Sequence, residues 1–487
     1  MRDKKMEKLF NIEEYCKDIN SILSMKDVEI NDSDKEYVIL IAKESGAWAT
    51  INKPYIYVIK ELLDKEITLG QFKETFPEHI QLLNLLFNSG VLKVNHISLF
   101  HDKLKKRQCK ISKAQICQVV LRYTKNCNLS CSYCYAHTDI TSSTSMSNET
   151  VLYILRKLNE SYPEKVINLS FHGGEPLLNY NKLVPLVKDI RNISENIRFY
   201  IQTNGTLVTK EIANFLKIEG FNVGISIDGF DTESNSHRNL SNGNSSLKQS
   251  LIGLDHLLNA GISPGIFTVV TAANQYKLLE HFDFYVNKGV KKFNFSPILY
   301  SGKAADKDYN VNIDHLIESN LRLVEKINYI NYKCNNIKDY VSEVNISNLL
   351  NNLSSLNVYN LCTLSPCGAG HTMLGFDTDG SLYPCDYFIG NLDFKIGNIY
   401  EMDDVKSWIY KNISAQNLSK RNIDSIRECR ICTWKSICTY HCASDSYFNY
   451  KTLYKPHSMC EYVKKIIPQI IDLLYRKKIS INYIPPC

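Results

Sequence analysis

The 487-residue sequence predicts an α/β fold in which a partial (β/α)6 TIM-like barrel lies between a small N-terminal domain and a cysteine-rich C-terminal domain. Three observations predict this. Strand-like runs alternate with amphipathic helical stretches from about residue 115, which is typical of a parallel sheet with right-handed crossovers. A separate pattern of strands and helices comes before them. Cysteines become dense past residue 360.

The composition is that of a globular protein, with 44% hydrophobic and 22% charged residues. The charged N-terminus has no signal-peptide pattern, and no apolar run approaches the ~20 residues of a membrane span. We therefore expect a cytoplasmic protein, in which the clustered cysteines among the 16 bind metals rather than form disulfides. The net charge of +6 is scattered, which disfavours nucleic acid as a partner and is compatible with an acidic peptide.

Residues 1–100 predict a compact unit. The runs YVILIA, around residues 38–42, and GAWATI, at 46–51, read as paired strands. Three helical patterns follow, the second beginning near Thr68 and the third ending at Gly90, before a closing strand. This is a winged-helix pattern. It resembles the RiPP recognition element of enzymes that modify ribosomally made peptides, which implies capture of a leader peptide as an added strand. A DNA-binding or purely structural winged helix is the alternative.

After a basic linker at 101–114, residues 115–345 form the predicted barrel. A helix starting at Ser147 follows the first strand. Polar and glycine-rich strings follow the strands directly, where barrel enzymes build their sites. The predicted strands cover residues 118–123, 166–171, 198–203, 222–227, 265–270 and 291–296.

The string after the first strand carries Cys127, Cys131 and Cys134 in a CX3CX2C spacing. Three thiolates are one short of the four that close a cubane cluster, so one iron would stay open to another ligand. Half of a zinc knuckle or buried free thiols are the alternatives. With an aromatic Tyr133 before the last cysteine, the string resembles the signature of the radical S-adenosylmethionine (SAM) superfamily.

This resemblance implies a [4Fe-4S] cluster at the three cysteines, with SAM on its open iron. An electron from a donor such as flavodoxin or ferredoxin then yields a 5′-deoxyadenosyl radical that removes a hydrogen atom from the substrate. The resemblance also implies that the string Gly173, Gly174, Glu175 and Pro176 binds the SAM amino group. The other expected cofactor contacts are Tyr133, Asn204, Ser226, Asp228 and Arg238.

Residues 346–487 carry a second cysteine array, Cys367-X12-Gly380-X4-Cys385, followed by Cys429-X2-Cys432-X5-Cys438-X3-Cys442 and then Cys460. The array resembles the SPASM domain, which binds two auxiliary iron-sulfur clusters. By analogy the first is held by Cys362, Cys367, Cys385 and Cys442, and the second by Cys429, Cys432, Cys438 and Cys460. The expected total is three [4Fe-4S] clusters, with zinc as the competing interpretation.

The sequence says less about the substrate than about the fold and the cofactors. Asp386, directly after Cys385, matches an acidic residue that anaerobic sulfatase-maturating enzymes are thought to use as a base, which favours oxidation of Cys or Ser to formylglycine. The N-terminal domain and the string FIGNLDFKIGN instead favour a maturase of ribosomal precursor peptides, of the sactipeptide or ranthipeptide type, that forms a crosslink such as a thioether. A zinc-stabilised peptide-binding protein without catalysis is a third reading.

Overall fold

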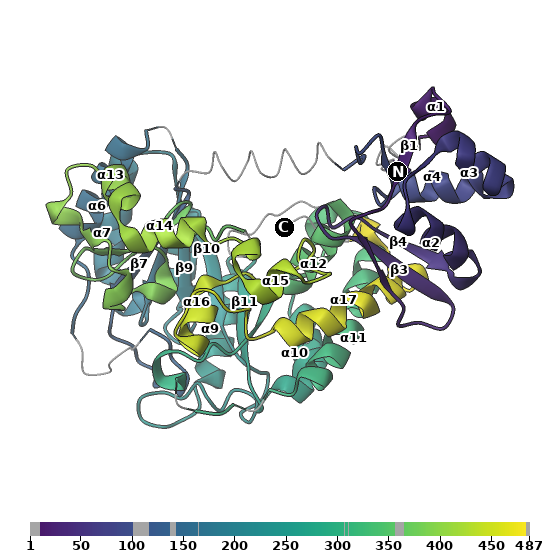
Figure 1. Ribbon diagram of the computed structural model, residues 1–487. Helices are drawn as coiled ribbons and strands as arrows, with labels where there is room; N and C mark the ends of the chain where they lie inside the picture. The colour runs from purple at the N-terminus through teal and green to yellow at the C-terminus, as the bar shows by residue number, and fades with distance from the viewer. Residues whose placement is uncertain are drawn as a thin grey trace.

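The computed structural model describes residues 10–100, 116–136, 143–163, 165–305, 307–309, 311–355 and 365–483 (Figure 1). The predicted linker at 101–114 and Cys362 lie outside the described residues. No helix in the described ranges combines the length and the apolar character that crossing a bilayer requires.

The N-terminal domain is built on two small antiparallel sheets, with strand orders β2-β3-β4 and β5-β1-β6. The predicted strand pair, three helices and closing strand are present, whereas α1, β1, β2 and β5 were not predicted. Thr68 caps α3 because its side chain accepts the Gln71 N–H while Gln71 bonds back. The elements are α1 (Ile12–Cys16), β1 (Ile22–Ser24), β2 (Val28–Asn31), β3 (Tyr37–Ala42), β4 (Trp48–Asn52), α2 (Ile56–Asp64), β5 (Ile67–Thr68), α3 (Leu69–Thr75), α4 (Ile80–Asn88) and β6 (Lys93–Val94).

The central sheet has the order β13-β12-β11-β10-β9-β8-β7-β14-β15-β16. Its strands from β7 to β13 run parallel and stand in chain order. The α/β prediction is confirmed, and all six predicted strands are present, with β13 as a seventh. Their bounds are β7 (Gln118–Thr124), β8 (Ile167–Gly173), β9 (Ile197–Thr203), β10 (Asn222–Ser226), β11 (Gly265–Val270), β12 (Lys292–Pro297) and β13 (Ser342–Glu343).

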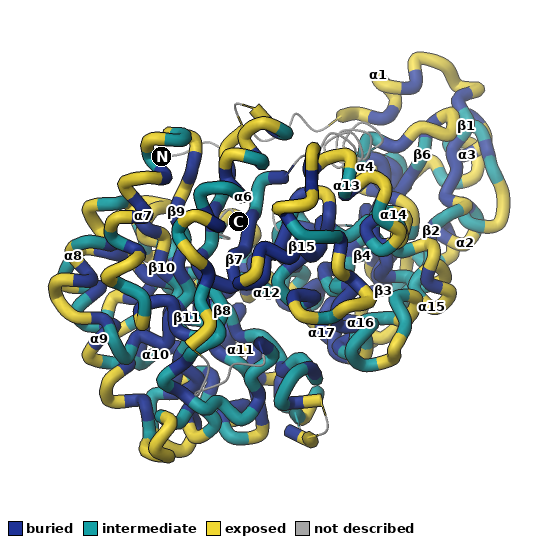
Figure 2. Tube along the Cα trace, turned by 90° about the vertical axis from the view of Figure 1, so that its left-hand side faces the viewer, coloured by how far each residue is buried: buried dark blue, intermediate teal, exposed yellow. Residues whose placement is uncertain are grey.

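Helices cover the outer face of these strands and bury their apolar sides in one large core. Figure 2 shows buried residues along the strands and exposed residues on the outer helices. Ser147 caps the first helix, as predicted, because its hydroxyl accepts the Thr150 N–H. The helices are α6 (Asn148–Ser161), α7 (Tyr180–Ile193), α8 (Lys210–Ile218), α9 (Leu247–Asn259), α10 (Leu278–Asn287), α11 (Ile313–Tyr332) and α12 (Val344–Ser355).

The C-terminal part continues the barrel sheet instead of folding apart from it. Strand β14 pairs in parallel with β7, and β15 and β16 follow as antiparallel strands. The sequence did not predict this continuation. The remaining elements are β14 (Met373–Phe376), β15 (Ser381–Tyr383), β16 (Gly397–Asn398), α13 (Val405–Lys411), α14 (Ile413–Lys420), α15 (Arg427–Arg430), α16 (Ala443–Tyr450) and α17 (Cys460–Tyr475).

Strand β3 joins the N-terminal domain to the rest of the protein. Its Val38 and Leu40 lie in the domain's own core, whereas Tyr37, Ile39 and Ile41 lie in the large core of the barrel. The Tyr37 hydroxyl also donates to the Asp472 carboxylate of α17 at 2.9 Å. The domain therefore packs against α17 and α12 (Figure 1).

Candidate functional site

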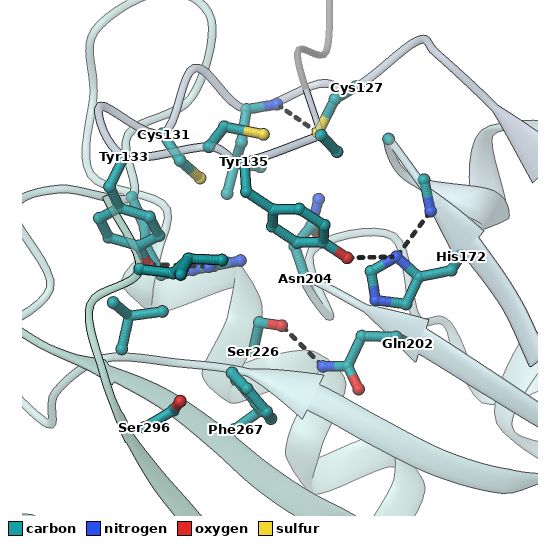
Figure 3. A pocket seen from close by; sticks show the side chains of 18 of the residues that line it. Cys127, Cys131, Tyr133, Tyr135, His172, Gln202, Asn204, Ser226, Phe267 and Ser296 are labelled. Carbon is teal, nitrogen blue, oxygen red and sulfur yellow. Dashed lines mark hydrogen bonds between the residues drawn. The ribbon is translucent and has the colours of Figure 1, made fainter. Parts of the chain in front are cut away.

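A cavity of about 220 Å³ lies at the carboxyl ends of the parallel strands. Cys127, Cys131 and Cys134 all line it, so the loop after β7 brings its three thiols to one place (Figure 3). Phe267, Val269 and Ile298 line the opposite side with apolar surface. This position matches the expectation that the site follows the first strand.

The thiols are held in surroundings that suit a metal cluster. Burial, together with the Glu175 carboxylate, raises the pKa of Cys127 to about 12, and burial also raises the pKa of Cys131. A bound cation is what would draw protons from such thiols. Three thiols around one cavity are the donor set of a [4Fe-4S] cluster that keeps one iron open, because each thiolate binds a different iron.

The glycine pair after β8 packs directly on the cysteine loop. A Cβ at Gly174 would lie 1.8 Å from the Asn126 carbonyl oxygen, and Gly173 has a φ of +119°. Gly174 N–H donates to the Thr124 carbonyl at 2.7 Å, and Glu175 N–H donates to that of Asn126 at 2.8 Å. Both glycines line the cavity, and only glycine permits this approach of the two loops.

Glu175 and Pro176 lie behind the cavity wall in the described structure. The Glu175 carboxylate is fully buried and accepts the Thr203 hydroxyl at 2.8 Å and the Asn204 N–H at 2.7 Å. It also accepts the Leu177 N–H at 3.1 Å. Glu175 therefore ties the glycine loop to the loop after β9.

Tyr133, Asp228 and Arg238 form a buried trio. The Tyr133 hydroxyl donates to the Asp228 carboxylate, and the Arg238 guanidinium donates to the Tyr133 oxygen at 3.1 Å. Burial raises the pKa of Asp228, with Arg238 opposing the shift. Tyr133 and Arg238 line the cavity, whereas Asp228 stands behind them and accepts the Val269 N–H at 3.0 Å.

Asn204 and Ser226 line the cavity from the ends of β9 and β10. Asn204 donates to the Asn128 side chain in the cysteine loop at 2.9 Å. Ser226 accepts the side-chain N–H of Gln202 at 2.7 Å. Gln202 also lines the cavity and was not among the predicted site residues. Its position two residues before Asn204, in the same string at the end of the strand, was the available signal.

Asp386 reaches the same cavity from the C-terminal domain. The Tyr135 hydroxyl lies 3.4 Å from the Asp386 carboxylate and 3.4 Å from His172 Nδ1, which accepts the Gly173 N–H at 2.8 Å. Burial lowers the pKa of His172, so the ring is neutral at neutral pH. Tyr135 and His172 were not predicted, although each adjoins a predicted motif residue.

The cysteines of the C-terminal array gather in two further places. Cys429, Cys432, Cys438 and Cys460 line one small cavity. A second small cavity is lined by Cys367, Cys385 and Cys442, with Asp386 at its edge. These are the two sets expected by analogy, apart from Cys362, which lies outside the described residues.

Comparisons with known proteins agree with this geometry. Residues 121–284 match the model of the Radical SAM superfamily. An uncharacterized protein of Archaeoglobus fulgidus is 30% identical over 366 residues, which cover 72% of this chain and 80% of that protein. A cysteine-type anaerobic sulfatase-maturating enzyme of Clostridium novyi is 25% identical over 377 residues, or 72% of this chain and 94% of the enzyme.

Solved structures share the fold. The anSMEcpe protein with bound AdoMet superposes with a TM-score of 0.63 at 19% identity, covering 74% of this chain and 99% of that chain. Streptococcus suis SuiB bound to the precursor peptide SuiA superposes with a TM-score of 0.55 at 17% identity, covering 90% of this chain and 100% of that chain. The α/β barrel of this protein is therefore of the kind found in both.

Proposed function

Because the chain belongs to the radical SAM superfamily, we propose that it is a maturase that cleaves SAM reductively and removes a hydrogen atom from a ribosomal precursor peptide. The product we favour is a crosslink, a thioether between a Cys sulfur and a carbon of another residue. One observation carries the choice: the likeness to SuiB spans 90% of this chain, whereas the likeness to anSMEcpe spans 74%.

When bound at Cys127, Cys131 and Cys134, a [4Fe-4S] cluster supplies the electron for SAM cleavage. The chain's own residues orient SAM and exclude water. Gly173 and Gly174 expose backbone edges to the cavity, and Arg238 offers a guanidinium to a carboxylate. The remaining cysteine sets hold two auxiliary clusters, for a total of three.

Asp386 is the proposed proton acceptor. Its carboxylate lines the cavity and lies beside the Tyr135 hydroxyl. A substrate thiol or hydroxyl placed there would lose its proton to this carboxylate, while the SAM-derived radical would take one hydrogen atom from the peptide and an auxiliary cluster would accept the remaining electron. The Tyr135 hydrogen bond holds the carboxylate in place.

The N-terminal domain is the proposed site of leader binding. Strands β2 and β4 are the two edges of its larger sheet in the described structure, and each pairs with β3. An extended leader peptide can add to such an edge through main-chain hydrogen bonds. A precursor with its leader should then be turned over faster than the same core peptide alone.

A second candidate is an anaerobic sulfatase-maturating activity, which converts Cys or Ser to formylglycine. Two observations favour it, namely the position of Asp386 in the cavity and the sequence likeness to such enzymes. Both candidate activities oxidise a residue of a peptide, but they give different products. Identifying the product therefore distinguishes them.

The test uses anaerobically reconstituted protein with SAM, dithionite and a Cys-containing peptide encoded beside its gene. A thioether removes two hydrogens from the peptide and abolishes alkylation of the Cys by iodoacetamide. Formylglycine instead gives an aldehyde that reacts with a hydrazide. Cys131→Ala should form no 5′-deoxyadenosine.

The metal content of the protein tests the third hypothesis, that of a zinc-stabilised peptide-binding protein without catalysis. The reconstituted protein should be brown and hold about twelve irons, as three four-iron clusters. Colourless protein with stoichiometric zinc would instead support a zinc-stabilised protein without catalysis.

A further inference from the structure

One of the two cysteine sets in the C-terminal part lies against the N-terminal domain. It consists of Cys429, Cys432, Cys438 and Cys460, which line one small cavity and which we call the 429–460 set. Residues 433–437 connect its second and third cysteines. Three side chains of this segment hydrogen-bond to residues that lie 391 to 404 positions earlier in the chain. The cysteine site is therefore bordered by a domain that carries none of its cysteines.

Strand β2 holds the start of the segment. The Thr433 hydroxyl donates to the Glu29 carboxylate of β2. The other oxygen of that carboxylate pairs with Lys43 Nζ at 2.7 Å. Glu29 is thus fixed from within its own domain, and its free oxygen is presented to the residue that directly follows Cys432.

The turn between β3 and β4 holds the rest of the segment. Lys435 Nζ donates to the Glu44 carboxylate at 2.8 Å and to that of Asp424 at 3.0 Å. The Ser436 hydroxyl donates to the Lys43 carbonyl at 2.5 Å. Lys435 is only 7% exposed and lines the cavity of the 429–460 set. Its ammonium has lost most of its hydration, so both carboxylates are needed to stabilise it.

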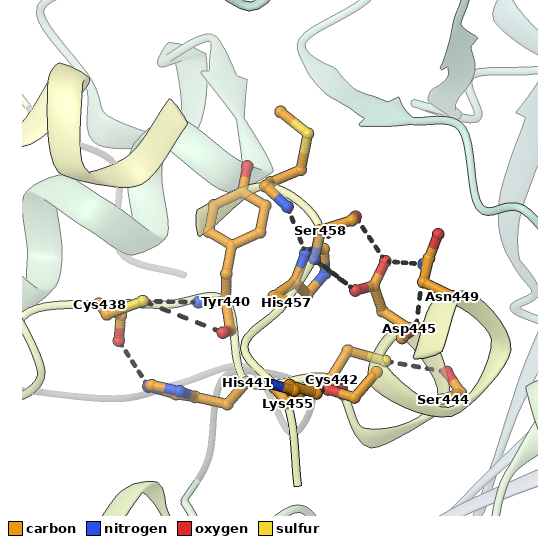
Figure 4. A network of polar contacts seen from close by, with 12 residues as sticks. Cys438, Tyr440, His441, Cys442, Ser444, Asp445, Asn449, Lys455, His457 and Ser458 are labelled. Carbon is orange, nitrogen blue, oxygen red and sulfur yellow. Dashed lines mark hydrogen bonds and ion pairs between the residues drawn. The ribbon is translucent and has the colours of Figure 1, made fainter. Parts of the chain in front are cut away.

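The backbone of the segment is tied directly to the cysteines. Lys435 N–H donates to the Cys432 carbonyl at 3.2 Å, and Cys438 N–H donates to the carbonyl of the buried Trp434 at 2.9 Å. Beyond the segment, His441 Nε2 lies 2.8 Å from the Cys438 carbonyl (Figure 4). A shift of the segment therefore moves the two cysteines at its ends.

We propose that the N-terminal domain completes the metal site of the 429–460 set, and that Glu29 and Glu44 are positioning residues for its cysteines. Because coupling between two sites is reciprocal, a metal bound there in turn stabilises β2 and the turn after β3. The inference rests on the proposed function for the identity of the metal as an iron-sulfur cluster. The coupling itself applies to any metal held by these thiolates.

The first test measures how fast the reconstituted full-length protein loses iron to a chelator. Glu29→Ala/Glu44→Ala removes both carboxylates and should release about four of its roughly twelve irons severalfold faster than the native protein. Glu29→Gln/Glu44→Gln keeps an acceptor oxygen at each contact and should restore slow release.

The matched control is Glu36→Ala, which removes a carboxylate of the same domain that pairs with Arg476 instead of the segment. It should release iron as the native protein does. Native release rates in Glu29→Ala/Glu44→Ala would overturn the inference. Faster loss from all three sites together would also reject it, because that result indicates general destabilisation.

Hydrogen exchange of the native protein tests the reciprocal effect. Removing the metal should increase amide exchange in β2 and in the turn after β3 severalfold, because the segment at 433–437 no longer holds them. Helix α4 of the same domain is the internal control and should not change. Unchanged exchange in β2 and the turn would contradict the coupling, and this measurement is decisive even where a variant fails to fold.

The two proposals fail separately. A protein that holds zinc at the 429–460 set and shows these same effects on zinc release would keep the inference and count against the maturase function. An iron-loaded protein that modifies a peptide, and whose Glu29→Ala/Glu44→Ala variant releases iron at the native rate, would keep the function and reject the inference.

Discussion

At Gly174 a single missing side chain decides whether the loop after β8 can meet the cysteine loop. A Cβ there would overlap the Asn126 carbonyl, which is backbone and cannot move aside cheaply. At Gly265, by contrast, the nearest atom to a new Cβ is 3.8 Å away, and the backbone is ordinary. The two glycine positions of the barrel therefore differ in whether the surrounding structure leaves room for a side chain.

Gly174→Ala should weaken SAM binding by about tenfold or more, because the glycine loop must shift away from the cysteines. Gly265→Ala, as the matched control, should bind SAM as the native protein does. Equilibrium dialysis with labelled SAM on both reconstituted variants measures the difference. Native affinity in Gly174→Ala would mean that the loop contact is not required.

His281 makes the stability of the barrel depend on pH. It is 1% exposed, its Nε2 lies 3.2 Å from the Thr268 hydroxyl, and burial lowers its pKa to about 3. The pKa of an unfolded histidine is ~6.5. The unfolded state therefore binds the proton more readily, and stability is present above about pH 6.5 and is lost as the pH falls toward 3.

Between pH 7.5 and 5.0 this residue should remove about 2 kcal/mol of unfolding free energy. His281→Phe keeps an aromatic ring between Tyr285 and Phe295 and cannot be protonated. Scanning calorimetry at the two pH values should show a smaller drop in melting temperature for the variant. The same drop in both proteins would place the acid sensitivity elsewhere.

At the scale of elements, Arg421 connects three pieces of the cysteine-rich C-terminal part. It follows α14, is 3% exposed, and donates to the carbonyls of Leu453 and His441 and to the hydroxyl of Ser446. These contacts hold the turn after Cys438 against α16. One planar guanidinium makes all of them, which a lysine ammonium cannot reproduce.

Arg421→Lys should therefore lower the iron content of reconstituted protein from about twelve to about eight or fewer per chain. The cluster at Cys127, Cys131 and Cys134 should persist, since it lies in another loop. Iron analysis with electron paramagnetic resonance checks both statements. The control is Arg322→Lys, at an exposed position on α11, which should retain all the iron. If Arg421→Lys also retains about twelve irons, the three contacts of Arg421 are not needed for cluster binding.

At the scale of the whole molecule, the N-terminal domain is part of the common core. Tyr37, Ile39 and Ile41 are each at most 2% exposed and pack outside the domain's own core. Burying a side chain of this size contributes about 1.5–3 kcal/mol. The Trp48 indole N–H also donates to the Leu353 carbonyl at 2.9 Å.

Removing residues 1–100 should lower the melting temperature and cause aggregation, because it uncovers the apolar surface beneath β3. Calorimetry and light scattering measure this. Arg476→Ala, which breaks ion pairs to Asp34 and Glu36 across the same junction without uncovering apolar surface, should change little. A truncated protein that stays monomeric and melts like the full chain would show that the domain is separable.

Much of the barrel could be predicted from the sequence, because its signals are local. The six strands alternate with helices at short range, and the Ser147 cap and the glycine pair lie next to the elements that they serve. The edge strand β14 could not be predicted in this way. Its four residues resemble any short apolar run, and its pairing with β7 depends on a partner 255 residues away, as Met373 opposite Gln118 shows.

From the sequence alone, the alternation of strands and helices predicted the chain order of the barrel strands, because such periodicity is local. The cysteine string resembled the radical SAM signature, and the match to that superfamily's model agrees with it. Only the folded chain shows that Tyr135, His172 and Asp386 meet in one cavity. These residues belong to separate elements that are far apart along the chain, so no local pattern in the sequence predicts their contact.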